Sequence, residues 1–143
     1  MKPIRKSIVY AAPIDRVWHA LTDAETLGRW LMPNDIEPVV GHRFTFRTTP
    51  SPGFDGIVSC QVTIANEPTR LAYSWQSGDV DTLVTWELEA LDEATTRLTL
   101  EHTGFRGFQQ VFVRTILTLG WKRKLLPDKL RAVVEGEPLV SRR

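Results

Sequence analysis

Cysteine, histidine and long apolar runs are scarce in this 143-residue chain. Its single cysteine, Cys60, excludes an internal disulfide. Eighteen basic residues against seventeen acidic residues leave a formal charge of +1, with both signs spread along the sequence. This balance gives no reason to expect nucleic acid as a partner. No stretch approaches the roughly 18 consecutive apolar residues of a membrane span, and the first residues lack the apolar core of a signal peptide. We therefore expect a cytoplasmic protein without integral membrane association.

Several sequence motifs of catalysis and cofactor binding are also missing. The chain has no Gly-x-Ser-x-Gly elbow, no glycine-rich loop for phosphates and no dinucleotide fingerprint. His19, His42 and Cys60 show none of the close spacings that zinc sites use. We therefore expect neither a cofactor nor a bound metal.

The first third of the chain predicts one strand followed by two short helices. Residues 4–10 alternate as a strand does. Pro13 suits the first turn of a helix, where its missing N–H group has no partner to lose. Thr22 or Asp23 then caps a second short helix that ends near Trp30.

From residue 41 to residue 104 the apolar pattern changes to the period of two that is typical of strands. β-branched and aromatic residues are enriched there, and turn residues separate five runs. These runs predict an antiparallel meander with one buried and one wet face. The inner face is predicted to hold Phe44, Phe46, Leu71, Tyr73, Trp75, Val84, Trp86, Leu88, Leu98, Leu100 and His102. The outer face is predicted to hold Glu87, Glu89, Arg97, Thr99 and Glu101.

The last third predicts a long helix. Residues 108–121 are apolar around more than one face, which predicts a helix buried on both sides. Pro127 predicts a kink or a restart, with a final segment through Leu130, Val133 and Val134. With no repeat and no linker, residues 1–143 are expected to form one domain of the α+β class.

Five segments, taken in order, resemble the activator of heat-shock-protein ATPase homologue group of the START-like (SRPBCC) superfamily. They are residues 12–23 (APIDRVWHALTD), 27–30 (LGRW), 71–75 (LAYSW), 96–105 (TRLTLEHTGF) and 120–121 (GW). The resemblance implies a helix-grip fold, in which a curved antiparallel sheet wraps around a long C-terminal helix, with two short helices after the first strand. It covers nearly the whole chain.

Members of this superfamily serve as carriers of hydrophobic ligands, polyketide cyclases, hormone receptors or co-chaperone domains, because one fold can host many functions. The resemblance therefore implies a cavity between the sheet and the C-terminal helix. Eukaryotic co-chaperone members carry an additional N-terminal domain, whereas this sequence begins at the strand before Ala12 and Pro13. In the final helix Gly120, Trp121 and Leu125 match the common pattern, but Asp128 stands where the next apolar residue is expected.

The main functional prediction is the binding of a small hydrophobic or aromatic molecule, without turnover and with a homodimer as one possible state. Large aromatic side chains are typical of small-molecule pockets, although ordinary core filling explains each of them equally well. The predicted ligand-binding residues are Trp30, Phe44, Phe46, Tyr73, Trp75, Trp86, His102, Phe112 and Trp121.

Two alternatives remain open from the sequence. His102 is the one histidine that the strand phase places inward, so it is a candidate general acid or base for a cyclase- or hydrolase-like enzyme. A hydrogen-bonded structural histidine explains the same position, and no second catalytic residue stands in register with it. The other alternative is a stress-related, co-chaperone-like interaction domain.

Overall fold

The computed structural model describes residues 2–50, 52, 54–106, 109–125 and 129–135, without the side chains of residues 109–112 and 123–125. Six antiparallel strands form one sheet in the order β1-β6-β5-β4-β3-β2. The strands are β1 (Ile4–Tyr10), β2 (Arg43–Arg47), β3 (Ile57–Asn66), β4 (Arg70–Ser77), β5 (Val80–Asp92) and β6 (Thr95–Thr103). This arrangement confirms the predicted α+β class and the consecutive meander from β2 to β6.

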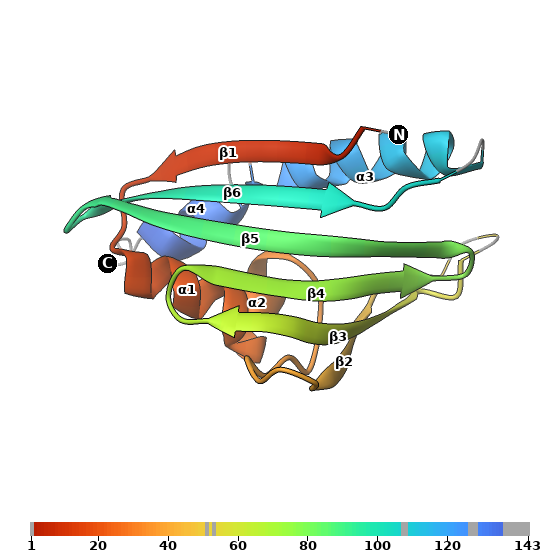
Figure 1. The fold of residues 1–143 in the computed structure, drawn as a ribbon, viewed down its shortest axis with the longest axis horizontal. Helices are drawn as coiled ribbons and strands as arrows, with labels where there is room; N and C mark the ends of the chain where they lie inside the picture. Colours follow the sequence, from red (N-terminus) through yellow and green to blue (C-terminus); the bar gives the residue numbers. More distant parts are fainter. Residues whose placement is uncertain (1, 51, 53, 107–108, 126–128, 136–143) are drawn as a thin grey trace.

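The described residues contain four helices, and Figure 1 shows these helices on one face of the sheet. They are α1 (Ile14–Thr22), α2 (Ala24–Trp30), α3 (Gln109–Leu125) and α4 (Lys129–Glu135). The two short helices after the first strand are confirmed, and Asp23 caps α2 by accepting hydrogen bonds from the backbone N–H and hydroxyl of Thr26. Pro127 lies outside the described residues. Among the described residues, no helix has the length and apolar character needed to cross a membrane.

The core occupies the layer between the helices and the inner face of the sheet. All eleven residues predicted for the inner face are buried. On the outer face, Glu87, Glu89 and Arg97 are exposed as predicted. The prediction that Thr99 faces water is wrong, because this residue is only 8% exposed. It lies on the outer face between Ser7 of β1 and Glu87 of β5, and its hydroxyl is 3.1 Å from that of Ser7.

The prediction that the long C-terminal helix is buried on both sides is wrong for the described part of α3. Trp121 is buried, but Ile116 and Leu119 are more than half exposed. The physical reason is the position of the helix. It lies beside the edge strand β1, where Arg114 donates hydrogen bonds to the carbonyl groups of Lys2 and Pro3. Figure 1 shows α3 at the upper edge of the sheet, near the N-terminal end of β1.

Candidate functional site

The fold brings eight of the nine predicted ligand-binding residues into one buried aromatic cluster between the sheet and the helices. Its members come from two helices and four strands. They are Trp30 of α2, Phe44 and Phe46 of β2, Tyr73 and Trp75 of β4, Trp86 of β5, His102 of β6 and Trp121 of α3. The ninth predicted residue, Phe112, has its side chain outside the described part of the structure.

The rings of this cluster contact one another without interruption. Trp30 stands edge-on to Trp86, with ring centroids 6.0 Å apart, and Trp86 stands edge-on to Trp121 at 5.5 Å. Trp121 lies 5.6 Å from Trp75, which lies 5.5 Å from Phe46. Such edge and tilted contacts place the positive edge of one ring against the negative face of the next. The four tryptophans thus form one continuous wall that runs from α2 to α3.

The wall continues along the strands toward β2. Phe44 lies 5.4 Å from Phe46 and 5.1 Å from Tyr73, ring centroid to ring centroid. Tyr73 accepts a hydrogen bond from the indole N–H of Trp86 at 3.0 Å. Burial raises the pKa of Tyr73, so its hydroxyl keeps its proton throughout the ordinary pH range.

His102 is the polar centre of this cluster, and its hydrogen bonds define its tautomer. The indole N–H of Trp121 donates to Nδ1 of His102 at 3.1 Å. Nδ1 therefore carries no proton, and Nε2–H donates to the hydroxyl oxygen of Thr82 at 2.7 Å. The Thr82 hydroxyl donates in turn to the carbonyl of Trp75 at 3.0 Å. Both ring nitrogens are satisfied, and the relay joins α3 to β6, β5 and β4.

This environment keeps the imidazole of His102 neutral. Burial lowers its pKa from the ordinary 6.5 to about 3, because a charged ring would lose its hydration. Its two hydrogen-bond partners, Trp121 and Thr82, are an indole and a hydroxyl rather than a carboxylate. The geometry therefore resembles that of a structural histidine more than that of a general base poised near neutral pH.

Two donors in the cluster have no acceptor among the described residues. The hydroxyl of Tyr73 accepts from Trp86 but donates to no described atom, and the indole N–H of Trp75 donates to none. Both side chains are at least 95% buried. Buried polar groups are normally hydrogen-bonded, so these two donors mark a place on the inner face of β4 where an acceptor is needed.

Sequence reasoning missed two residues of the cluster. Thr82 shares the inner phase with Val84 and Trp86, but the sequence pattern predicts this strand only over residues 83–91, whereas β5 begins at Val80. Phe105 is buried 4.8 Å from the His102 ring, centroid to centroid. It follows Gly104, whose positive φ of 101° ends the strand pattern. Extending the alternation of Trp86 and Val84 by one more step toward the N-terminus would have indicated Thr82. Phe105 lies beyond the end of β6, so no strand alternation could have indicated it.

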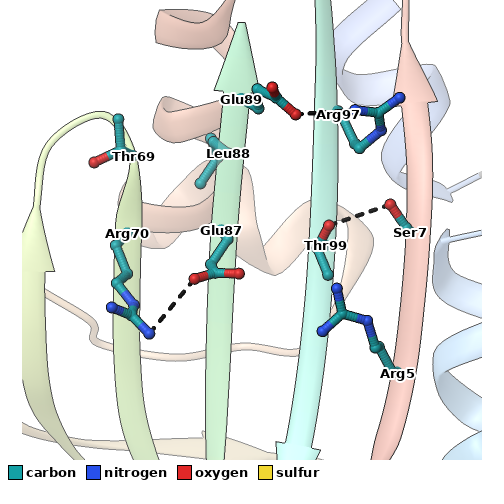
Figure 2. A pocket seen from close by; sticks show the side chains of 9 residues that line it. All are labelled: Arg5, Ser7, Thr69, Arg70, Glu87, Leu88, Glu89, Arg97 and Thr99. Atoms are coloured by element: carbon teal, nitrogen blue, oxygen red, sulfur yellow. Dashed lines mark hydrogen bonds and ion pairs between the residues drawn. The ribbon is translucent and has the colours of Figure 1, made fainter.

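The outer face of the sheet carries a separate, polar hollow. It measures about 460 Å³. Its lining residues are Arg5, Ser7, Thr69, Arg70, Glu87, Leu88, Glu89, Arg97 and Thr99. These side chains come from β4, β5, β6, β1 and the turn before β4, as Figure 2 shows.

Ion pairs rather than apolar contacts characterise this hollow. Arg70 lies 3.4 Å from Glu87, and Arg97 lies 2.9 Å from Glu89, with all four side chains at least 45% exposed. This hollow does not have the apolar lining expected of a site for a hydrophobic ligand. Elsewhere in the described part of the chain, no group of three His, Cys, Asp or Glu residues is placed to hold a metal ion.

The fold and the aromatic interior define the class of protein, which is a helix-grip domain of the START-like type. The chain belongs to the family of activator of Hsp90 ATPase homolog 1-like proteins, whose model matches residues 11–135. A search of curated proteins found no significant match.

Solved structures of bacterial proteins share this fold over nearly the full chain. A protein from Mesorhizobium loti is 26% identical with a TM-score of 0.82, and the match covers 94% of this chain and 97% of that one. A protein from Bacillus halodurans is 29% identical with a TM-score of 0.75 over the same shares. The Aha1 dimer from Colwellia psychrerythraea is 21% identical with a TM-score of 0.74, covering 96% of this chain and 100% of that one.

Proposed function

We propose that this protein binds a small aromatic molecule carrying a hydrogen-bond acceptor, between the inner face of β4 and helix α3. The single observation that carries the proposal is the pair of buried donors on Tyr73 and Trp75, which lack an acceptor among the described residues and stand within a continuous aromatic wall. Such a wall supplies large apolar area, while a few polar groups orient the ligand. A carbonyl group would satisfy either donor.

Entry of a ligand requires movement of α3. Trp121 packs against both Trp75 and Trp86, with ring centroids 5.6 Å and 5.5 Å apart. A flat aromatic ligand reaches the donors of β4 only when these rings part. Because the hydrogen bond to His102 holds Trp121 in place, we expect His102 to position the helix rather than to contact the reacting atoms of a substrate.

Two fluorescent probes of similar size test the proposal. Prodan is an aromatic ketone and offers an acceptor, whereas N-phenyl-1-naphthylamine has no carbonyl group. We expect Prodan to quench tryptophan emission saturably at one site per chain. Tyr73→Phe should weaken Prodan binding by up to about tenfold, the value of one hydrogen bond, while leaving the affinity for N-phenyl-1-naphthylamine unchanged.

Thermal unfolding of the Tyr73→Phe protein serves as the folding control. The substitution removes only a hydroxyl whose proton has no described acceptor, so we expect little loss of stability. Saturable binding of neither probe would contradict the proposal. If Tyr73→Phe weakened the binding of both probes equally, the ligand would not need a hydrogen-bond acceptor. The site would then be one for apolar ligands in general.

The enzyme alternative is tested by His102→Asn, which retains much of the polarity and size of the side chain. For a binding protein, ligand affinity should remain within about tenfold. Loss of a general base would instead lower a turnover rate by about 10² to 10⁴ while binding survives. A substrate whose conversion collapses in this variant would establish the enzyme.

Family membership supports a second candidate function, namely stimulation of the Hsp90 ATPase. The measurement is the ATPase rate of purified Hsp90 as this protein is added. A dose-dependent increase that persists in Tyr73→Phe would show that the activity does not depend on the Tyr73 hydroxyl. No increase would leave ligand binding as the function.

We also propose that the protein works in the cytoplasm, where its one thiol stays reduced, and that it forms a homodimer. The support for a dimer is the dimeric relative from Colwellia psychrerythraea. Light scattering of the purified chain measures the assembly directly, and a monomer mass at high concentration would contradict the dimer.

A further inference from the structure

Helix α3 presents an apolar ridge that the rest of the described structure leaves uncovered. Ile116 is 55% exposed and Leu119 is 57% exposed, one turn apart on the same face of the helix. The exposed Lys122 continues this row by another turn. We name Ile116, Leu119 and Lys122 the α3 ridge. A Cβ placed on Gly120, one turn beyond Ile116, would meet no described atom within 4 Å, so no described residue contacts the helix at that position.

Charge is distributed more unevenly than the formal total of +1 suggests. Residues 1–14 and 102–127 together contain eight basic residues and no acidic residue. The remainder of the chain therefore holds ten basic and all seventeen acidic residues. The even mixture of signs expected from the sequence as a whole does not extend to these two segments.

The fold brings β1 and α3, the described parts of these two segments, together at one edge of the molecule. Arg114 of α3 donates hydrogen bonds to the carbonyl groups of Lys2 at 2.7 Å and Pro3 at 3.2 Å. Figure 1 shows β1 and α3 along the same upper edge of the sheet. The α3 ridge is therefore an exposed apolar row beside the basic residues of β1 and α3. One of these, Arg5, is paired with Glu101 of β6 at 3.7 Å.

We propose that the β1–α3 edge docks onto the surface of an anionic lipid bilayer. A bilayer supplies both features that complement this edge, an apolar phase for Ile116 and Leu119 and negative headgroups for basic residues of β1 and α3 such as Lys2 and Lys122. Reversible attachment is expected, because only two apolar side chains are presented.

A second copy of the chain fits this edge less well. Symmetric pairing of α3 with α3 would bring two basic edges together, and like charges repel. Two side chains also expose far less than the roughly 800 Å² per partner of a stable protein interface. An acidic protein partner would satisfy the charge but would meet the same shortage of apolar area.

The experiment is cosedimentation of the full chain with vesicles. One set contains phosphatidylcholine alone, and the other contains about one-third phosphatidylserine to supply negative surface potential. We expect binding to the anionic vesicles only, weakening as salt screens the charges. Poly-glutamate, duplex DNA and inorganic phosphate serve as competing anions without an apolar phase.

Variants assign the binding to the α3 ridge. Ile116→Glu and Leu119→Glu should each weaken vesicle binding by about tenfold or more, because each replaces a membrane-facing apolar group by a negative charge. Lys122→Gln should weaken it about fivefold. Both apolar positions are exposed in the folded chain, so these variants should keep the unfolding temperature of the parent.

Val40→Glu is the matched control. Val40 is also an exposed apolar residue, at 63%, but it precedes β2 at the opposite edge of the sheet from β1. This variant should bind anionic vesicles as the parent does. Equal loss in Val40→Glu would show a general charge effect and overturn the assignment to α3.

Three further outcomes would overturn the proposal. The first is absence of binding to anionic vesicles at low salt. The second is binding of poly-glutamate or DNA that is as tight as vesicle binding, with Leu119→Glu weakening neither. That result would leave only a polyanion site. The third is a dimer in solution that dissociates in Ile116→Glu, which would assign the ridge to a second copy. Ile116 is exposed on α3, whereas the proposed ligand site at Tyr73 is buried. Prodan binding by the Ile116→Glu protein therefore tests the ligand site separately from membrane docking.

Discussion

The two faces of the sheet differ in the environment of their polar atoms, although the same strands form both faces. Polar atoms are mostly buried and hydrogen-bonded on the inner face and mostly exposed to solvent on the outer face. On the inner face, His102 has one partner for each ring nitrogen and is fully buried. On the outer face, Arg97 and Glu89 pair at 2.9 Å but remain largely exposed to solvent. Burial makes each polar contact expensive to lose, whereas water replaces the contacts of an exposed pair. The comparison teaches that the face of the sheet on which a polar side chain lies, more than its residue type, sets how much its contacts contribute to the free energy of unfolding.

The largest expected difference is between two adjacent residues of β5. Trp86 is fully buried between Trp30 and Trp121, whereas Glu87 faces the outer hollow. Trp86→Ala should lower the free energy of unfolding by about 3–5 kcal/mol through lost apolar burial and a residual cavity. Glu87→Ala should change it by about 0.5 kcal/mol at most. Urea unfolding measures both, and similar values for the two variants would break the comparison.

A smaller but more specific effect is expected from the pH dependence of His102. Burial lowers its pKa in the folded state to about 3, whereas in the unfolded chain it takes up a proton below about pH 6.5. Between these two pH values the unfolded state binds more protons, so the free energy of unfolding falls as the pH falls. The slope contributed by one such group is at most about 1.4 kcal/mol per pH unit, and above pH 6.5 the contribution is constant.

Urea unfolding at several pH values measures this slope. His102→Asn removes the group that titrates, so its stability should depend less steeply on pH than that of the parent. Leu88→Ala is the control. Leu88 is buried on the same face of the sheet but does not titrate, and it lies four residues along β5 from Val84, which pairs with His102. It should be less stable but keep the slope of the parent. An unchanged slope in His102→Asn would show that the buried imidazole does not set the pH dependence.

The smallest expected effect is on the outer face. A double-mutant cycle on Arg97 and Glu89 should give a coupling of about 0.2–1 kcal/mol, because both side chains are well exposed. The coupling should diminish further in high salt. A coupling above about 2 kcal/mol would show that the polar hollow is more shielded than the exposure of this pair indicates.

The strand phases are predictable because an antiparallel sheet with one covered face imposes a period of two on its residues. That period is enough to place His102 and Trp86 inward and Glu87 outward. It could not show that Trp121, nineteen residues after His102, supplies the hydrogen bond to Nδ1. Nor could it show that Thr99 is covered, since that depends on its neighbours across β1 and β5.

For the long C-terminal helix, the sequence predicted the element but not its burial. Its apolar residues correctly predicted a helix, but the degree of burial depends on what lies on each side. Because α3 runs beside the edge strand β1, Trp121 meets the core while Ile116 and Leu119 meet no cover in the described structure.

The sequence by itself determined the element types, their order and the inward set of strand residues, because alternation and turn residues are local properties of the chain. Only the tertiary structure decided which of these residues contact one another. It joined rings from six separate elements into one cluster, satisfied both nitrogens of His102 and brought two basic segments to one edge. Such contacts depend on how distant segments are placed in space, which no local pattern encodes.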